Sequence, residues 1–114
     1  MTPVAATILQ QIRTTDRFAL GSWGITNISS RVEMLYDETS LQLCLVRGRK
    51  VIIKYDLGSD LYEVTVGRNA PTFEKVLGRR IASGTKWVEE GSRSDVYSDS
   101  LVQVIDSLLK GKRF

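Results

Sequence analysis

Apolar residues recur at helical spacing near both ends of the chain. Near the start they are spaced i, i+3, i+4, i+7 and comprise Ala5, Ile8, Leu9 and Ile12. Near the end they are spaced i, i+4, i+7, i+8, i+11 and comprise Tyr97, Leu101, Val104, Ile105 and Leu108. This spacing predicts a helix over residues 3–13, opened by Pro3, and a C-terminal amphipathic helix capped by Ser94 or Asp95.

Between the two helices, apolar and polar residues alternate, which is typical of strands that bury one face. The alternating stretches are residues 32–36, 41–46, 50–55 and 61–66. The connections at 47–49 and 56–60 are too short for a parallel crossover. We therefore predict an antiparallel meander in which Gly48 takes a positive φ.

The other segments are less regular. Glycines punctuate residues 18–28, which we predict to form a short strand with a bulge or kink. Beyond the meander we expect a loop at 68–71, a strand at 73–82 interrupted at Gly78, a partner strand at 85–89 and a flexible polar stretch at 89–93.

These elements predict an α+β fold in a single domain over residues 1–114. It comprises an N-terminal helix, an antiparallel meander of about five strands, and a C-terminal amphipathic helix packed on one face of the sheet. The length of 114 residues suits one core, and a hydrophobic content of 42% is sufficient for folding.

Composition also bears on the compartment. No apolar run approaches the roughly 20 residues that span a bilayer, and the N-terminus lacks the pattern of a secretory signal. Cys44 is the one cysteine in the sequence, so no internal disulfide can form, and we predict that it is a buried hydrophobe. We therefore expect a cytoplasmic protein that does not contact a membrane.

The sequence contains no histidine, the residue that most often serves as catalytic base or metal ligand. The carboxylates of Asp56 and Asp60 flank a predicted turn, where aspartate commonly makes local hydrogen bonds. We therefore expect no catalytic residues, no metal site and no cofactor, and we predict that the chain is not an enzyme.

The net charge of +3 permits contact with nucleic acid or with an acidic protein surface. A first cluster of cations at the predicted hairpin comprises Arg47, Arg49, Lys50 and Lys54. A second comprises Arg68, Lys75, Arg79, Arg80 and Lys86. In a strand Arg79 and Arg80 would point to opposite sides. Each cluster can contact phosphates or an acidic partner, or it can be a solvated strand face that discourages edge pairing.

Two tryptophans are further candidates for a contact surface. Trp23 lies near two glycines and can stack on a base or anchor a partner, and Trp87 can do the same. Packing in the core is the alternative for both. The candidate contact residues are Arg47, Arg49, Lys50, Lys54, Arg79, Arg80, Lys86 and Trp23.

Three segments carry a resemblance to known proteins. They are Ile8–Gln11 followed by Arg17–Leu20, Lys50–Lys54 leading to Asp60–Val64, and Val96–Leu101. In these segments the chain resembles a family of small uncharacterised proteins encoded by bacteriophages, prophages and other mobile elements. The resemblance implies a phage accessory gene product expressed in the bacterial cytoplasm, and it implies no particular activity or functional residue.

Three hypotheses for the function remain, in order of preference. The first, from the resemblance, is a non-enzymatic phage-type accessory protein that binds a host macromolecule, in one form as an inhibitor of a bacterial anti-phage immune complex. The second is a nucleic-acid-binding protein that uses the basic hairpin. The third is a small ribonuclease toxin. The expected partners are a host protein complex or nucleic acid, and an exposed strand edge leaves a homodimer open.

Overall fold

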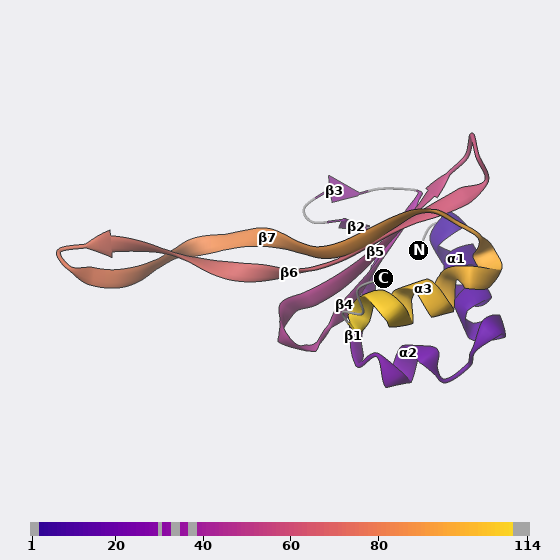
Figure 1. Ribbon diagram of the computed structural model, residues 1–114, viewed down its shortest axis with the longest axis horizontal. Helices are drawn as coiled ribbons and strands as arrows, with labels where there is room; N and C mark the ends of the chain where they lie inside the picture. The colour runs from indigo at the N-terminus through magenta and orange to yellow at the C-terminus, as the bar shows by residue number, and fades with distance from the viewer. Residues whose placement is uncertain (1–2, 30, 33–34, 37–38, 111–114) are drawn as a thin grey trace.

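A five-stranded antiparallel sheet organises the structure (Figure 1). The computed structural model describes residues 3–29, 31–32, 35–36 and 39–110. Its elements are α1 (Pro3–Thr15), α2 (Ala19–Ser22), β1 (Ile25–Ser29), β2 (Arg31–Val32), β3 (Leu35–Tyr36), β4 (Ser40–Leu45), η1 (Val46–Gly48), β5 (Arg49–Asp56), β6 (Leu61–Val76), β7 (Arg79–Val96), η2 (Ser98–Ser100) and α3 (Leu101–Leu109). The strand order β1-β4-β5-β6-β7 confirms the predicted α+β meander.

The core lies between this sheet and the two longer helices. Its fully buried strand residues are Leu41, Leu43, Val51, Ile53, Val64 and Val66. The fully buried helix residues include Ile8, Ile12, Leu101 and Ile105. Helix α1 lies against β4, α3 lies against β6 and β7, and the two helices touch each other. Each such side chain contributes about 1.5–3 kcal/mol by burial, so the predicted apolar faces are the ones that hold the fold together.

The segment predicted as one strand over 32–36 is organised differently. Arg31 pairs with Tyr36 and Val32 with Leu35, so the described residues of this segment form two short antiparallel strands, the small sheet β2-β3, and residues 33–34 lie outside the described residues. The prediction of a single strand is wrong because period-two alternation does not reveal where a chain reverses.

The predicted kinked strand over 18–28 is wrong in its first half. The Asp16 carboxylate accepts a hydrogen bond from the Phe18 backbone N–H at 3.0 Å, and the short helix α2 begins at the next residue. Gly24, with a φ of 72°, then turns the chain into β1. Strand β1 does contain the expected irregularity, at the register shift between Ile25 and Asn27.

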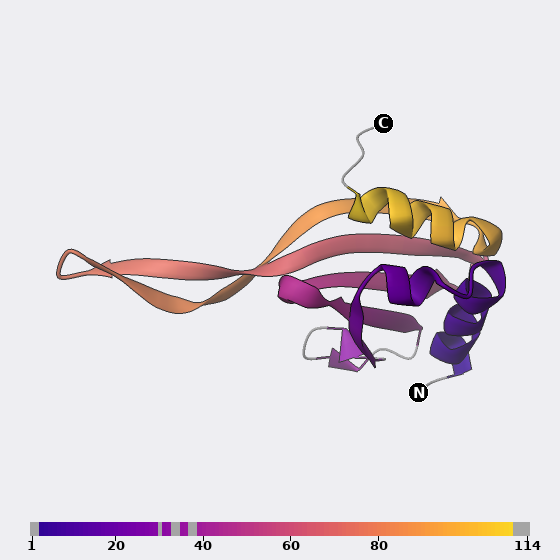
Figure 2. The ribbon, with the colours of Figure 1, turned by 90° about the horizontal axis from the view of Figure 1, so that it is seen from below.

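Strands β6 and β7 continue beyond the rest of the sheet as a two-stranded ribbon, here called the arm (residues 68–88; Figures 1 and 2). The strands have 16 and 18 residues, and within the arm they pair from Arg68–Val88 to Val76–Arg79. The arm gives the molecule its elongated dimensions of 54 × 29 × 24 Å. None of its residues belongs to the buried core.

The arm replaces the loop predicted at 68–71 and the strand predicted across 73–82. The chain reverses at Leu77 and Gly78, whose φ angles are 53° and 77°. Positive φ at both positions is the conformation of a type I′ turn, whose twist matches that of the two strands. The prediction treated Gly78 as an interruption within one strand, whereas it is half of a hairpin turn.

Two other predictions for the C-terminal half need correction. The stretch expected to be flexible, 89–93, lies within β7, and so do the proposed helix caps Ser94 and Asp95. Helix α3 begins only at Leu101, after the short helix η2, and Tyr97 is 65% exposed rather than part of the core.

In the described part of the chain, no helix has both the length and the apolar character needed to cross a membrane.

Helix α1 is also tied to the sheet by a polar contact. The hydroxyl of Tyr62, on β6, donates a hydrogen bond of 2.8 Å to Oε1 of Gln11. Burial of the ring is the main reason that the pKa of Tyr62 lies above its usual value of 10.0. The neighbouring Tyr55 donates to the Asp60 carboxylate, and this bond is the main cause of its own raised pKa.

Alkali is therefore expected to weaken the fold through these tyrosines. A raised pKa means that the folded protein holds the proton more tightly than the unfolded chain. The resulting stabilisation is fully present below pH 10.0 and is lost as the pH rises through the folded-state pKa. Urea unfolding of the wild type and of Tyr62→Phe between about pH 9 and about pH 11.5 should give a shallower loss of stability in the variant. Equal slopes would contradict this assignment.

Candidate functional site

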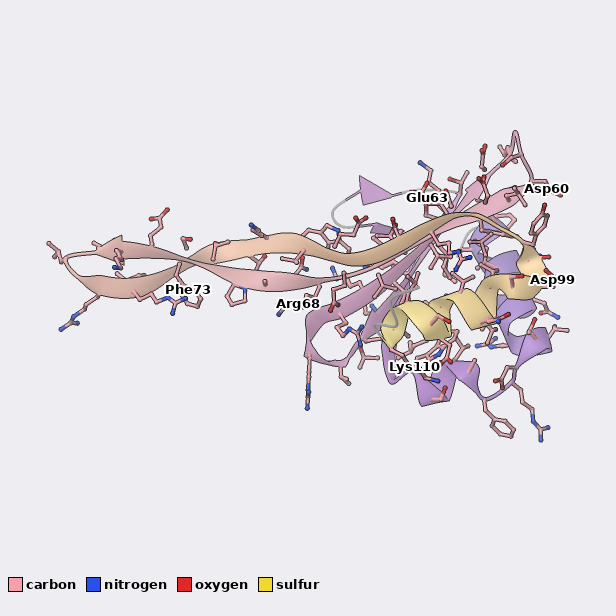
Figure 3. The ribbon with its side chains drawn as sticks, viewed as in Figure 1. Asp60, Glu63, Arg68, Phe73, Asp99 and Lys110 are labelled. Atoms are coloured by element: carbon pink, nitrogen blue, oxygen red, sulfur yellow. The ribbon has the colours of Figure 1, made fainter. Side chains whose placement is uncertain are left out.

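The net positive charge of the sequence is concentrated in the arm. It contains five cations, Arg68, Lys75, Arg79, Arg80 and Lys86, and the single acid Glu74. The arm therefore carries +4, while the eleven cations and twelve acids in the rest of the sequence leave −1. In Figure 3, Arg68 and Phe73 lie along the arm, whereas Asp60 and Asp99 lie at the opposite end of the molecule.

The pairing of the strands distributes these cations over both faces of the arm. Lys75 pairs with Arg80 and the next pair is Val76 with Arg79, so Arg79 and Arg80 point to opposite faces, as predicted for a strand. Lys86 pairs with Ala70 and shares the face of Arg79. Positive charge therefore surrounds the ribbon and does not form a single stripe.

An aromatic ring lies among the cations on the arm. The guanidinium of Arg80 stacks over the ring of Phe73 at 4.3 Å from its centroid, and Phe73 is 45% exposed. A hollow of about 480 Å³ opens beside this pair. Its lining consists of Ala70, Pro71, Thr72, Phe73, Glu74, Lys75, Arg80 and Lys86. The hollow thus combines three cations, the carboxylate of Glu74 and a partly exposed aromatic ring. The cations and the ring are of the kinds that contact phosphates and bases.

The arm meets the rest of the described structure, here called the body, at a close contact between the backbone of Gly67 and the side chain of Trp87. Trp87 is partly buried and lies across Gly67, which pairs with Lys50 of β5. A Cβ atom at Gly67 would lie 2.5 Å from Cζ2 of Trp87 and 2.6 Å from the Val88 carbonyl oxygen. The joint therefore requires glycine at this position.

The predicted basic hairpin lies beside the base of the arm. Arg49 pairs with Arg68, which brings the two predicted clusters of cations together at this point. Lys50 and Lys54 alternate with buried Val51 and Ile53, so they face away from the two packed helices. Arg47 is exposed at the end of the hairpin, in a left-handed conformation with a φ of 63°.

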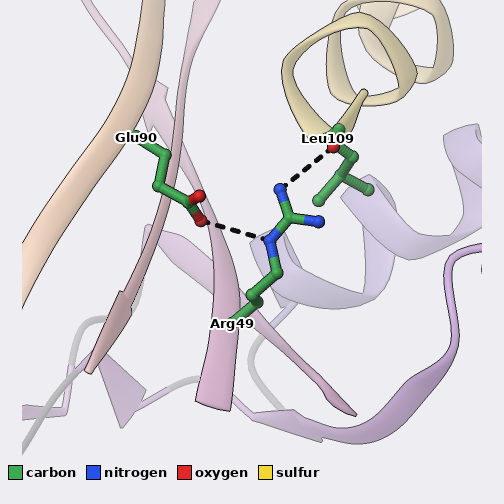
Figure 4. A network of polar contacts seen from close by, with 3 residues as sticks. All are labelled: Arg49, Glu90 and Leu109. Carbon is green, nitrogen blue, oxygen red and sulfur yellow. Dashed lines mark hydrogen bonds and ion pairs between the residues drawn. The ribbon is translucent and has the colours of Figure 1, made fainter. Parts of the chain in front are cut away.

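Two predicted contact residues have roles inside the protein. The guanidinium of Arg49 forms an ion pair with Glu90 at 3.1 Å and donates a hydrogen bond of 3.0 Å to the Leu109 carbonyl, near the end of α3 (Figure 4). Arg49 therefore fastens β5 to β7 and to α3. Trp23 is only 9% exposed and packs in the core, which corrects its placement on a contact surface.

The apolar tip of the arm was not predicted from the sequence. Leu77 is 98% exposed, and the neighbouring Val76 and Ile81 are 45% and 48% exposed. The spacing of apolar residues in this segment is neither helical nor strictly alternating. The signal that could have revealed the tip is therefore the two-residue turn itself, for which Leu77 is an unusual residue.

Comparison of the chain with models of protein families, with curated proteins and with solved structures found no match. What the arm can do is therefore inferred from its own shape and charge.

Proposed function

We propose that this chain is a non-enzymatic nucleic-acid-binding protein that contacts its partner through the arm. The supporting observation is the concentration of net positive charge on a ribbon that projects from a slightly acidic body. Cations placed in this way bind phosphates and release the counterions that surround nucleic acid. We therefore place the proposed contact site on the arm. The hairpin predicted from the sequence lies at the base of the arm.

The dimensions of the arm suit a duplex. The nine residue steps from Arg68 to Leu77 extend the ribbon by about 30 Å at ~3.3 Å per residue, close to one turn of B-DNA. Two-stranded ribbons can enter either the major or the minor groove of B-DNA. Because the cations lie on both faces, an arm in the groove can reach phosphates on both sides.

A protein partner is the second candidate, and it follows the resemblance to phage accessory proteins in a bacterial cytoplasm. In that case the arm would block a host complex, for instance one that acts in anti-phage immunity. The observation in its favour is the apolar surface along the outer half of the arm, formed by Phe73, Val76, Leu77 and Ile81. Such side chains can fill a pocket on a protein, but they do not account for the charge around them.

Removing two arm charges is expected to weaken duplex binding and its salt dependence together. Arg79→Gln/Arg80→Gln should lower affinity for a 30-base-pair duplex by about 10- to 100-fold at ~0.1 M salt. The slope of log affinity against log salt should become less steep by about 2, because two phosphate contacts are lost. Fluorescence anisotropy across a salt series measures both quantities.

Two controls belong to this experiment. Arg13→Gln/Arg17→Gln removes the same charge from exposed positions at the end of α1 and just beyond it, and should leave the salt slope unchanged. Arg79→Lys/Arg80→Lys keeps the charge and should retain most of the affinity. Undetectable binding of the wild type at low salt, or equal losses in the two glutamine variants, would contradict nucleic-acid binding through the arm.

A further inference from the structure

The end of the arm carries a side chain that the fold does not use. Leu77 is 98% exposed and has no place in the core, although leucine is among the residues that proteins most often bury. It occupies the first of the two central positions of the turn, with a φ of 53°. Leucine is disfavoured in this left-handed conformation, because its Cβ approaches the following carbonyl oxygen.

Asparagine or aspartate would suit this position better, since Asn-Gly and Asp-Gly are the preferred pairs for type I′ turns. A leucine here weakens the turn and exposes apolar surface to water. A backbone outlier of this kind points to a role outside the folding of the chain itself.

The surroundings of Leu77 indicate the chemistry of its partner. Three cations, Lys75, Arg79 and Arg80, and the single acid Glu74 lie within three residues of it. The surroundings of the leucine therefore carry a net positive charge, which suits a partner that is anionic close by. The exposed Val76 and Ile81 widen the apolar tip. A duplex supplies this combination, since apolar base stacks lie between two rows of phosphates.

We propose that Leu77 acts as a wedge that inserts between stacked base pairs of double-stranded DNA and bends it. This inference rests on the proposed function, because the arm must first hold the duplex. Leucine is one of the side chains that unstack base steps in this way, with bends of roughly 20–90°. Separating the base pairs is unfavourable, and burial of the tip together with the phosphate contacts of Lys75, Arg79 and Arg80 offsets it.

The test compares wild type with Leu77→Asn on a 30-base-pair duplex that carries a donor and an acceptor dye at its two ends. The duplex has a TA step at its centre, because pyrimidine–purine steps kink readily. The wild type is expected to raise energy transfer as it binds. Leu77→Asn should bind within about 10-fold of the wild-type affinity, since all arm cations remain, but leave the duplex straight.

Loss of folding does not explain the expected difference, because asparagine improves the turn. Leu77→Met provides a matched control that keeps an apolar side chain of similar volume and should still bend the duplex. A 2-aminopurine base at the TA step reports unstacking directly, and its fluorescence should rise with the wild type and with Leu77→Met only.

The outcomes separate the wedge from the binding function. Binding without a rise in energy transfer, or equal bending by Leu77→Asn, would overturn the wedge and leave nucleic-acid binding intact. Binding to the single strand alone would also overturn the wedge. No binding to either nucleic acid would overturn both proposals and favour a protein partner for the tip.

Discussion

Replacing residues 70–86 with an Asn-Gly turn is expected to weaken duplex binding strongly while leaving the fold of the body intact. Asn69 and Trp87 form a strand pair, so a two-residue turn can close the shortened hairpin at that point. The deletion removes four of the five arm cations, which corresponds to an affinity loss of about 10³-fold at ~0.1 M salt.

The fold should survive because the core draws nothing from the deleted segment. Every residue between 68 and 95 lies outside the buried apolar set, which resumes at Val96. The midpoint of thermal unfolding should therefore shift by less than about 5 °C, the range expected for a change of about 1 kcal/mol.

Circular dichroism and anisotropy on the same preparation test both parts of this expectation. Retained duplex binding by the shortened protein would place the contact elsewhere, with the hairpin around Arg47 and Lys54 as the next surface to change. A collapse of thermal stability would show instead that the arm supports the body.

Gly67→Ala is expected to destabilise the protein by about 1–3 kcal/mol, the usual range for an overpacked interior position. The added methyl group would meet both the Trp87 ring and the Val88 carbonyl oxygen at less than 3 Å. The ring can move only by leaving its place against the sheet, and the carbonyl belongs to the paired backbone of β7. Urea unfolding monitored by tryptophan fluorescence measures the change.

Gly21→Ala is the matched control for this substitution. Gly21 lies in helix α2, and a Cβ built on it meets no atom within 4 Å. Alanine in a helix is favoured over glycine by about 0.5–1 kcal/mol, so this variant should be slightly more stable than the wild type. If Gly67→Ala proves as stable as the wild type, the contact between Gly67 and Trp87 relaxes without strain and the prediction is wrong.

The elements that bury a face were predictable from the sequence. Helix α1 and strands β4, β5 and the first half of β6 each leave a periodic apolar pattern, because one side of each contacts the core. Asp56 was also interpreted correctly. Its carboxylate accepts hydrogen bonds from the Gly58 N–H and the Ser59 hydroxyl within the turn, each at 3.0 Å.

The arm could not be predicted in this way, because neither of its faces meets the core. Its strands therefore carry no period-two apolar pattern, and Pro71 suggested a loop. A proline is tolerated there because each strand of a two-stranded ribbon has a free edge. This part of the structure is held together by backbone pairing between β6 and β7, and such pairing requires no particular pattern of side chains in the sequence.

For a similar reason, some of the candidate contact residues are accessible as predicted, whereas others make contacts inside the protein. Arg79, Arg80 and Lys86 lie on the exposed arm, so their predicted accessibility holds. The intramolecular role of Arg49 depends on Glu90 and Leu109, which are 41 and 60 residues away in the sequence. Contacts between residues so far apart in the sequence arise only from the tertiary fold, and no local sequence pattern predicts them.

The separation of arm from core also has an evolutionary consequence. Substitutions along residues 70–86 alter the proposed contact surface without changing the buried residues on which folding depends. Selection can therefore vary the charge, length and tip of the arm in small steps while the level of folded protein in the cell stays constant. Under the proposed function, a protein whose binding partner changes can adapt through substitutions confined to this one hairpin.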